Sequence, residues 1–347
     1  MTRDPGKARA ASPPDAGRGA ASGTRAERLD GARIAPAGAA EGAGDAGLFG
    51  PADEPPPADR GLPDPPEHLG PFPAGRGLGD GGARVRVARH RSRPAAWGDG
   101  PSLRIAAIGD LHMGEPWMPP ARLEALVAAV NALKPDLTVL LGDYVSHVFP
   151  MGRRCDPRDT ARRLAALEAP SGVWAVLGNH DWRDHKDAAF EGRRCAAWEA
   201  LEAAGVPVLE NRSVRLEAPR GGAFWLAGLG DQRIDRRGPG RSWTGTHDLD
   251  AAFAEAPEGA PTILLAHEPD IFPQAERAAL TLSGHTHGGQ VRILGRAPWI
   301  PSKHGARYAW GRYAEGGREL VVTAGLGYSV VPVRLGAPAE IAWVELG

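Results

Sequence analysis

Short apolar runs that end in polar clusters recur along this chain, and they constrain its fold more than any other feature. Five of them are LRIAAIGD, LTVLLGD, VWAVLGNHD, TILLAHEPD and LTLSGHTH. Runs of this length and composition are typical of buried strands. Amphipathic segments such as ARLEALVAAVNALKPD and TARRLAALEAP separate the first three runs. This order of strand, helix, strand, helix and strand, followed mostly by strands, predicts a layered α/β domain with a largely buried sheet.

The first 82 residues differ in composition from the rest of the chain. Ala, Gly, Pro, Asp and Arg dominate them, as in GAAEGAGDAGLFGPADEPPPADRGLPDPP. Such a segment lacks the β-branched and aromatic side chains whose burial offsets the entropy cost of ordering. We predict a disordered low-complexity tail over residues 1–82 and one domain over residues 83–347. Removal of the tail is then expected to leave folding and catalysis unchanged.

The charge of the chain is nearly balanced, with 41 Lys and Arg residues against 42 Asp and Glu residues and a net charge of -1. A charge this small gives no whole-molecule field that would attract a nucleic acid, and no nucleic-acid partner is predicted. The run RVRVARHRSR (84–93) alternates apolar and basic residues at its start. That alternation favours an edge strand with one wet face. The basic residues of this run could alternatively contact an anionic membrane surface.

The N-terminus and the cysteines bear on where such a chain would function. The segment MTRDPGKARA lacks the apolar core of a signal peptide, and no apolar run approaches the roughly 18 residues of a membrane span. As written, the sequence predicts a cytoplasmic protein. Cys155 and Cys195 form neither a metal-binding pattern nor a disulfide framework, so we expect two free thiols.

The polar clusters that end the five runs carry the chemistry. In layered α/β folds, functional groups gather in the loops at the carboxyl ends of the strands. A single Gly-Asp is usually an ordinary turn or cap, but here five clusters follow five apolar runs in order. Together they supply seven oxygen and nitrogen donors: Asp110, His112, Asp143, Asn179, His267, His285 and His287.

Seven donors exceed the four ligands of a tetrahedral zinc site. They suit two divalent metal ions that share one carboxylate, an arrangement that clamps the attacking and leaving oxygens in phosphoryl transfer. His285 and His287 would then lie two residues apart because each binds a different metal. A non-haem iron oxygenase would use only two histidines and one carboxylate. A metal-dependent or metal-free interaction scaffold on the same fold is a third alternative, which the loss of a ligand would favour.

The ordered motifs D-x-H, GD, GNHD, H and GHTH resemble the calcineurin-like metallophosphoesterase superfamily. LLGDYV, AVLGNHDW, LLAHEPDIF and SGHTHGGQV resemble its bacterial phosphodiesterase branch, which includes cell-envelope and lipid-linked hydrolases. The resemblance runs from about residue 85 to the C-terminus and implies a four-layer α/β/β/α sandwich with mixed sheets. It also implies ligand roles: Asp110, His112 and His287 for the first metal, Asn179, His267 and His285 for the second, and Asp143 as the bridge.

The same resemblance gives His180 a catalytic role beside the phosphate, where it would stabilise the transition state or protonate the leaving oxygen. Asp181 is either its partner or a capping residue. Ser146 stands where the protein-phosphatase branch carries an aspartate. A dyad between His180 and that aspartate is therefore unavailable, which disfavours a phosphoserine substrate.

We therefore predict a binuclear metal-dependent phosphoesterase that hydrolyses a phosphodiester or pyrophosphate with a hydroxide held between two divalent ions, Mn, Fe or Zn. A lipid-linked or cell-envelope substrate is what the resemblance implies. The alternatives are a phosphomonoesterase of broad specificity and a catalytically silent scaffold. Residues in GEPWMPP and APWIPSKHGARYAWGRY are predicted to contact an apolar substrate group or its phosphate. They are Trp117, Met118, Trp299, Ile300, Lys303, His304, Arg307, Tyr308, Trp310 and Tyr313.

Overall fold

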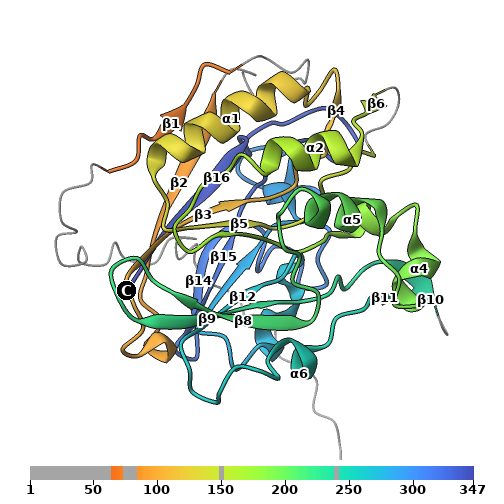
Figure 1. Cartoon of the computed structure of the whole chain (residues 1–347). Helices are drawn as coiled ribbons and strands as arrows, with labels where there is room; N and C mark the ends of the chain where they lie inside the picture. Colours follow the sequence, from red (N-terminus) through yellow and green to blue (C-terminus); the bar gives the residue numbers. More distant parts are fainter. Residues whose placement is uncertain (1–63, 73–83, 148–151, 238–241) are drawn as a thin grey trace, which may run out of the picture. The chain divides into compact units, whose positions relative to one another are not determined.

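The computed structural model describes residues 64–72, 84–147, 152–237 and 242–347. Two six-stranded sheets form the centre of this part of the chain (Figure 1). The first sheet has the order β1 (His68–Leu69), β2 (Val85–Ser92), β16 (Glu340–Leu346), β3 (Leu103–Ile108), β5 (Leu137–Leu140) and β7 (Val173–Ala175). The second has the order β14 (Gly311–Glu315), β15 (Arg318–Val322), β13 (Leu280–Ser283), β12 (Thr262–Leu265), β9 (Ala223–Gly228) and β8 (Arg212–Glu217). Two short pairs are β4 (Gly114–Glu115) with β6 (Arg153–Arg154), and β10 (Asp235–Arg237) with β11 (Ser242–Thr244).

Helices cover the outer faces of both sheets (Figure 1). On the first sheet these are α1 (Pro120–Leu133), α2 (Pro157–Leu164) and α5 (Ala196–Ala203). On the second, the short helix α6 (Leu249–Ala252) and the 3-10 helix η3 (Pro269–Gln274) pack on the strands. The remaining short helices are α3 (Asn179–Trp182), α4 (Lys186–Phe190), η1 (Ala95–Trp97) and η4 (His287–Gly289). The predicted four-layer α/β/β/α sandwich with mixed sheets is confirmed.

Side-chain alternation along the strands explains the layers. In β3, Leu103, Ile105 and Ala107 lie in the apolar core between the two sheets. Ala106 and Ile108 point the other way, into the core shared with the covering helices. Because successive strand side chains point to opposite faces, a strand that is buried on both faces needs an unbroken apolar run. The segment LRIAAI is apolar except for Arg104, and all six of its residues are buried.

Parallel pairing brings the ends of the apolar runs together. In the first sheet β3, β5 and β7 run parallel. In the second sheet β9, β12, β13 and β15 also run parallel. The carboxyl ends of parallel neighbours meet at one edge of a sheet, so the polar clusters after these strands collect there.

Residues 64–72 belong to the folded domain, although their composition predicts that they are part of the tail. β1 pairs antiparallel with β2, with Leu69 opposite Val85. Leu69 and Phe72 are 8% and 7% exposed and lie in the same core as the apolar face of α1. The boundary predicted at residue 82 is therefore corrected for this segment. The rest of the predicted tail, residues 1–63 and 73–82, lies outside the described residues.

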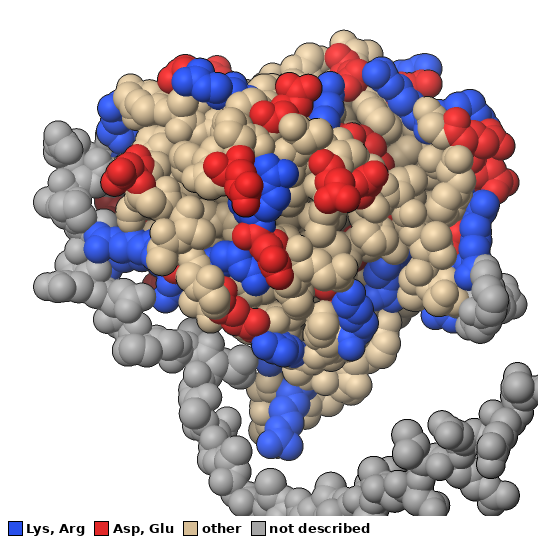
Figure 2. Space-filling view, turned by 90° about the horizontal axis from the view of Figure 1, so that it is seen from below, with Lys and Arg blue, Asp and Glu red and all other residues tan. Residues whose placement is uncertain are grey.

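The other features expected from the sequence can also be located. β2 pairs with β16 over residues 86–92 but with β1 at only two residues, so most of its other side is the edge of the sheet, as predicted. Cys155 and Cys195 are free thiols. Acidic and basic side chains are interspersed on the face drawn in Figure 2. Within the described segments, no helix combines the length and apolar composition needed to cross a membrane.

Candidate metal centre

Five loops carry the seven predicted ligands to the carboxyl ends of the strands. The loops after β3, β5 and β7 hold Asp110, His112, Asp143 and Asn179, and those after β12 and β13 hold His267, His285 and His287. All of these except Asn179 are buried, with exposures of 7% or less. Carboxylates are rarely buried to this degree unless they are paired or bind a metal.

Five of the seven predicted ligands adopt a left-handed backbone conformation. Their φ angles are 54° at Asp110, 43° at His112, 57° at Asp143, 67° at His285 and 52° at His287. Asp and His enter this region more readily than most residues, but each instance still costs of order 1–3 kcal/mol. Residues held this way cluster at functional sites, because the surrounding structure must fix their side chains. The strain therefore points to function rather than to ordinary turns.

Two glycines allow these loops to approach so closely. A Cβ atom on Gly178 would lie 2.3 Å from Asp143 Oδ1 and 2.7 Å from His267 Cε1. A Cβ atom on Gly284 would lie 2.5 Å from Asp110 Oδ2. These separations are far inside van der Waals contact. The glycines that open the GNHD and GHTH motifs are thus needed to leave room for the ligand side chains.

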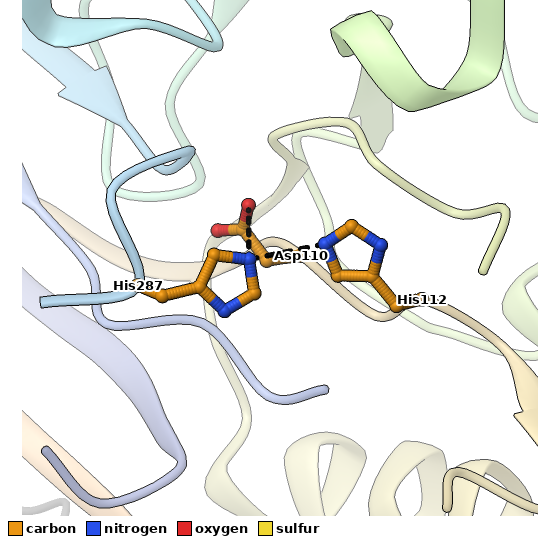
Figure 3. A group of neighbouring side chains, drawn as sticks. All are labelled: Asp110, His112 and His287. Atoms are coloured by element: carbon orange, nitrogen blue, oxygen red, sulfur yellow. Dashed lines mark hydrogen bonds and ion pairs between the residues drawn. The ribbon is translucent and has the colours of Figure 1, made fainter. Parts of the chain in front are cut away.

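Asp110, His112 and His287 converge from loops of both sheets into one group (Figure 3). The Nε2 atoms of His112 and His287 are 3.0 Å apart. The same atom of His287 lies 3.5 Å from Asp110 Oδ1. Two ligands that each lie about 2.1 Å from a metal ion are themselves about 3 Å apart. The spacing of these donors is therefore that of a metal site.

Asp143, His267 and His285 form a second group. His267 Nε2 lies 3.3 Å from Asp143 Oδ2 and 3.2 Å from His285 Nδ1. Asp143 Oδ2 is also 3.5 Å from His112 Nε2, so this one oxygen faces both groups. The other oxygen of Asp143 accepts a 2.8 Å hydrogen bond from the backbone N–H of His180. The structure thus divides the two histidines of the His-x-His motif between different groups.

Asn179 adds a donor that the protein itself does not satisfy. Its side-chain Oδ1 is buried and, within the described part of the chain, accepts no hydrogen bond. Asn179 lines the same cleft as Asp143 and His285. Leaving a buried acceptor unpaired costs about 1–3 kcal/mol, and a divalent cation beside it would remove that cost. The donor set therefore fits the metal ions that the sequence predicts.

Hydrogen bonds behind the imidazoles decide which nitrogen faces the centre. The Nδ1 atoms of His112 and His267 lie 3.3 and 2.6 Å from backbone carbonyl oxygens, to which they donate, so that Nε2 is left for a metal. His285 is reversed, because its Nε2 donates to a carbonyl oxygen at 3.0 Å. Burial lowers the pKa of His112, His285 and His287. These imidazoles are thus neutral near pH 7, the form that binds metals.

The carboxyl group of Asp143 is held in its ionised form. Burial alone would raise its pKa, but the charge of the adjacent His267 outweighs burial and holds the pKa well below its ordinary value. An ionised oxygen that faces both imidazole groups is the charge arrangement that two cations require. Burial alone would lower the pKa of His267, but the adjacent carboxylate of Asp143 raises it well above its ordinary value, so His267 would release a proton on binding a metal.

Asp181 organises the loop backbone rather than the imidazole of His180. Its two carboxylate oxygens accept hydrogen bonds of 2.9–3.2 Å from four backbone N–H groups, those of Asp143, Tyr144, Val145 and Gly178. This pattern favours the capping interpretation. It also joins the GNHD loop to the GD loop, which fixes Asp143 relative to Asn179.

His180 has a partner, His147, that the sequence motifs do not predict. Its Nδ1 lies 3.0 Å from Nδ1 of His147, and its ring centroid is 4.7 Å from that of His112. His147 follows Ser146 directly, and its Nε2 lies 3.8 Å from Asp184 Oδ2. The only signal in the sequence is the histidine that ends GDYVSH, one position beyond the missing aspartate.

A cleft of about 600 Å³ opens onto both groups. Five residues of the predicted centre line it: Asp143, Asn179, His180, His285 and His287. Four basic side chains line it as well: Arg183, Lys186, Arg233 and Arg236. Apolar side chains that contribute to its walls are those of Ile234, Trp243, Val291, Trp299, Val330 and Val331. An apolar cleft with a few fixed polar groups is typical of a ligand site.

Most of the predicted substrate contacts do not lie on this cleft. Trp299 lines it, whereas Trp117, Met118, Lys303 and His304 are not among its lining residues. Met118 is 1% exposed and packs in the core beside α1. The backbone N–H of Lys303 bonds to a carboxylate of η3, which holds this segment against that helix. The cleft lining also lacks the remaining predicted residues: Ile300, Arg307, Tyr308, Trp310 and Tyr313.

The sequence model of one family, described as calcineurin-like phosphoesterase, matches residues 103–289. This range contains all seven predicted ligands. The chain belongs to the calcineurin-like phosphoesterase family. The predicted superfamily is thereby confirmed, and with it the enzyme class of a metal-dependent phosphoester hydrolase.

Several relatives have similar sequences. The zebrafish "Transmembrane protein with metallophosphoesterase domain" is 31% identical over 254 residues, which cover 70% of this chain and 53% of that protein. The Bacillus subtilis "Uncharacterized metallophosphoesterase YkuE" is 28% identical, with 69% of this chain and 77% of that protein covered. The Escherichia coli "Phosphodiesterase YaeI" is 32% identical, with 70% and 82% covered. The chain thus spans about half the length of the zebrafish relative and most of the two bacterial ones.

Proposed function

We propose that this chain binds two divalent metal ions and hydrolyses a phosphodiester or pyrophosphate bond. In this assignment Asp110, His112 and His287 hold one ion, Asn179, His267 and His285 hold the other, and Asp143 joins them. The observation that carries the proposal is the position of Asp143 Oδ2, 3.5 Å from His112 Nε2 and 3.3 Å from His267 Nε2. One ionised oxygen that faces both imidazole groups is what a bridging ligand requires.

The chemistry divides between the metals and the protein. When bound, the two ions supply Lewis acidity, which activates water near neutral pH and neutralises charge on the phosphoryl oxygens. Mixed imidazole, carboxylate and amide donors accept Mn, Fe or Zn. Burial lowers the pKa of His180 to about 3, so its neutral imidazole, which lines the cleft beside Asp143, acts on the leaving oxygen as a hydrogen-bond donor. Such a positioned acid contributes a factor of about 10²–10⁴ to the rate.

The cleft walls support an anionic substrate that carries an apolar group. Within the described residues, Arg183, Arg233 and Arg236 form no ion pair with a carboxylate, whereas Lys186 binds Asp235 at 3.0 Å. Arg183 and Arg236 are therefore available to a phosphate, whereas Arg233 also donates to the carbonyl oxygen of Pro301. The apolar part of the substrate would contact the tryptophans that line the cleft. A lipid-linked phosphodiester or pyrophosphate combines both features.

The name of the Escherichia coli relative supports the diester, since that protein is called a phosphodiesterase. The phosphomonoesterase remains the second candidate, because a basic cleft also suits a monoester. A silent scaffold would bind metal without turnover.

Metal analysis of the purified protein together with a substrate panel tests the proposal. We expect two metal ions per chain and fastest turnover of an aryl phosphodiester or an acyl-chain pyrophosphate, ahead of an aryl monoester and a phosphoserine peptide. Trp299→Ala should raise KM for the acyl-chain substrate, while Trp117→Ala, outside the cleft, serves as the matched control. Fastest hydrolysis of the monoester would favour the second candidate. Two bound metals with no turnover of any ester would favour the scaffold.

A further inference from the structure

The large apolar side chains that the described residues expose are concentrated in two segments. Ile293, Leu294 and Trp299 are 61%, 97% and 66% exposed and lie in residues 291–299. Val330, Val331 and Leu335 are 54%, 43% and 49% exposed and lie in residues 329–335. One further exposed residue, Trp243 at 42%, lines the cleft. Concentrated exposed apolar side chains mark interaction surfaces, whereas scattered single ones need no explanation.

Backbone hydrogen bonds join the two segments into one surface, which we call the apolar ridge. Arg292 N–H donates to the Leu335 carbonyl oxygen at 2.7 Å, and Val291 forms a β-bridge with Leu335. Gln290 connects the ridge to the metal loop. Its side-chain amide donates to the carbonyl oxygens of Ser329 and Val331 at 3.0 and 2.9 Å. The ridge is therefore continuous with the loop that carries His285 and His287.

The ridge presents its apolar side chains through a fixed backbone. Ile293 and Arg296 exchange two backbone hydrogen bonds of 2.9 and 3.0 Å around a two-residue turn. Leu294 and Gly295 occupy that turn with φ angles of 51° and 78°. Val330 has a φ of 63°, which is a genuine outlier for a β-branched residue. A left-handed aliphatic residue that faces solvent gains no burial to offset its strain. Burial against a partner would offset it.

The charge around the ridge indicates which partner. No Asp or Glu occurs in residues 277–314 or 320–339, which contain both ridge segments. Arg292 and Arg296 lie within the first segment, and Arg296 is exposed. The basic cleft residues Arg233 and Arg236 stack on Trp243, with guanidinium carbons 5.0 and 4.7 Å from its ring centroid. An apolar tip flanked by basic residues, on two segments that contain no Asp or Glu, matches an anionic bilayer surface.

We propose that the apolar ridge docks the protein on an anionic lipid bilayer, with Leu294 and Ile293 inserted among the acyl chains and the arginines at headgroup level. Trp299, Val330 and Val331 belong both to the ridge and to the cleft. A phosphodiester at headgroup level would therefore enter the cleft without leaving the membrane. The docking proposal does not depend on hydrolysis, whereas the delivery of substrate rests on the proposed phosphodiesterase activity.

Vesicle flotation with the full, metal-loaded chain tests the docking. We expect binding to phosphatidylglycerol–phosphatidylcholine vesicles and much weaker binding to phosphatidylcholine alone. Leu294→Asp should reduce partitioning by about tenfold or more, the worth of one buried leucine side chain. Aspartate tolerates the left-handed turn position, so the fold is preserved. Gln274→Asp, at an exposed position on η3, adds the same charge elsewhere and should bind like the unaltered chain.

Three readouts separate the possible outcomes. Absence of binding to anionic vesicles, or unchanged binding by Leu294→Asp, would overturn the docking proposal. A dimer in light scattering that Leu294→Asp dissociates would show that the ridge binds a second copy instead, and would also overturn it. Turnover of a soluble aryl phosphodiester should be equal in the two variants. Vesicle binding without any diester turnover would leave docking intact and refute the proposed function alone.

Discussion

Removing residues 64–82 should destabilise the domain, although their composition predicts a dispensable tail. Leu69 and Phe72 are 8% and 7% exposed in the core that contains α1. Burial of each side chain contributes about 1.5–3 kcal/mol, so their loss costs roughly 3–6 kcal/mol as an upper estimate. A domain of this size has a total stability of about 5–15 kcal/mol. The loss is therefore a large fraction of the whole.

Thermal unfolding followed by circular dichroism measures this effect. Compared with a chain that lacks residues 1–63, one that lacks residues 1–82 should melt lower by roughly 6–24 °C, at about 2–4 °C per kcal/mol. Leu69→Ala and Phe72→Ala should each lower Tm in the full chain, and His68→Ala, at an exposed position of the same strand, should not. Equal melting temperatures for the two truncated chains would refute the assignment of β1 to the core.

The remaining predictions concern the candidate centre. Asp143→Asn should remove nearly all turnover and lower the metal content at both positions, and two tightly bound metals with full activity would exclude a bridging role. His180→Ala should keep both metals and lower kcat by on the order of 10²–10⁴, so loss of metal would make it a ligand instead. His147→Ala should lower kcat less than His180→Ala and leave KM and metal content unchanged; an unchanged kcat would make the contact incidental. Gly178→Ala places a Cβ 2.3 Å from Asp143 Oδ1, so wild-type metal content in that variant would contradict the described packing.

The convergence of the seven candidate ligands can be predicted from the sequence, because the pattern that predicts it is local. Each motif follows an apolar run, and a run buried on both faces can only be a central strand of a layered fold. Once parallel strands are assumed, their polar carboxyl ends must meet. His285 and His287 illustrate the limit of such reasoning. Their assignment to different groups depends on a left-handed turn, with φ angles of 67° and 52°.

Contacts between distant segments are harder to predict, because no local pattern reports them. β1 consists of two residues in a proline-rich stretch, and only its pairing with β2 reveals that Leu69 is buried. Met118 follows a ligand motif closely in sequence, yet its side chain faces the core at 1% exposure. Val330 lines the cleft from more than forty positions beyond the His-x-His motif. A residue's distance along the chain from a metal ligand therefore does not predict whether its side chain lines the cleft.

His147 contacts the imidazole of His180, although the aspartate expected one position earlier is missing. Ser146 removes the aspartate that would orient His180, but Nδ1 of the next residue lies 3.0 Å from Nδ1 of His180. Only one of these two nitrogens can carry the hydrogen in the bond. If His147 donates, the neutral His180 keeps its hydrogen on Nε2 and is a donor; if His180 donates, its Nε2 is an acceptor. A leaving oxygen needs the donor, so the proposed role of His180 requires His147 to be the residue that donates.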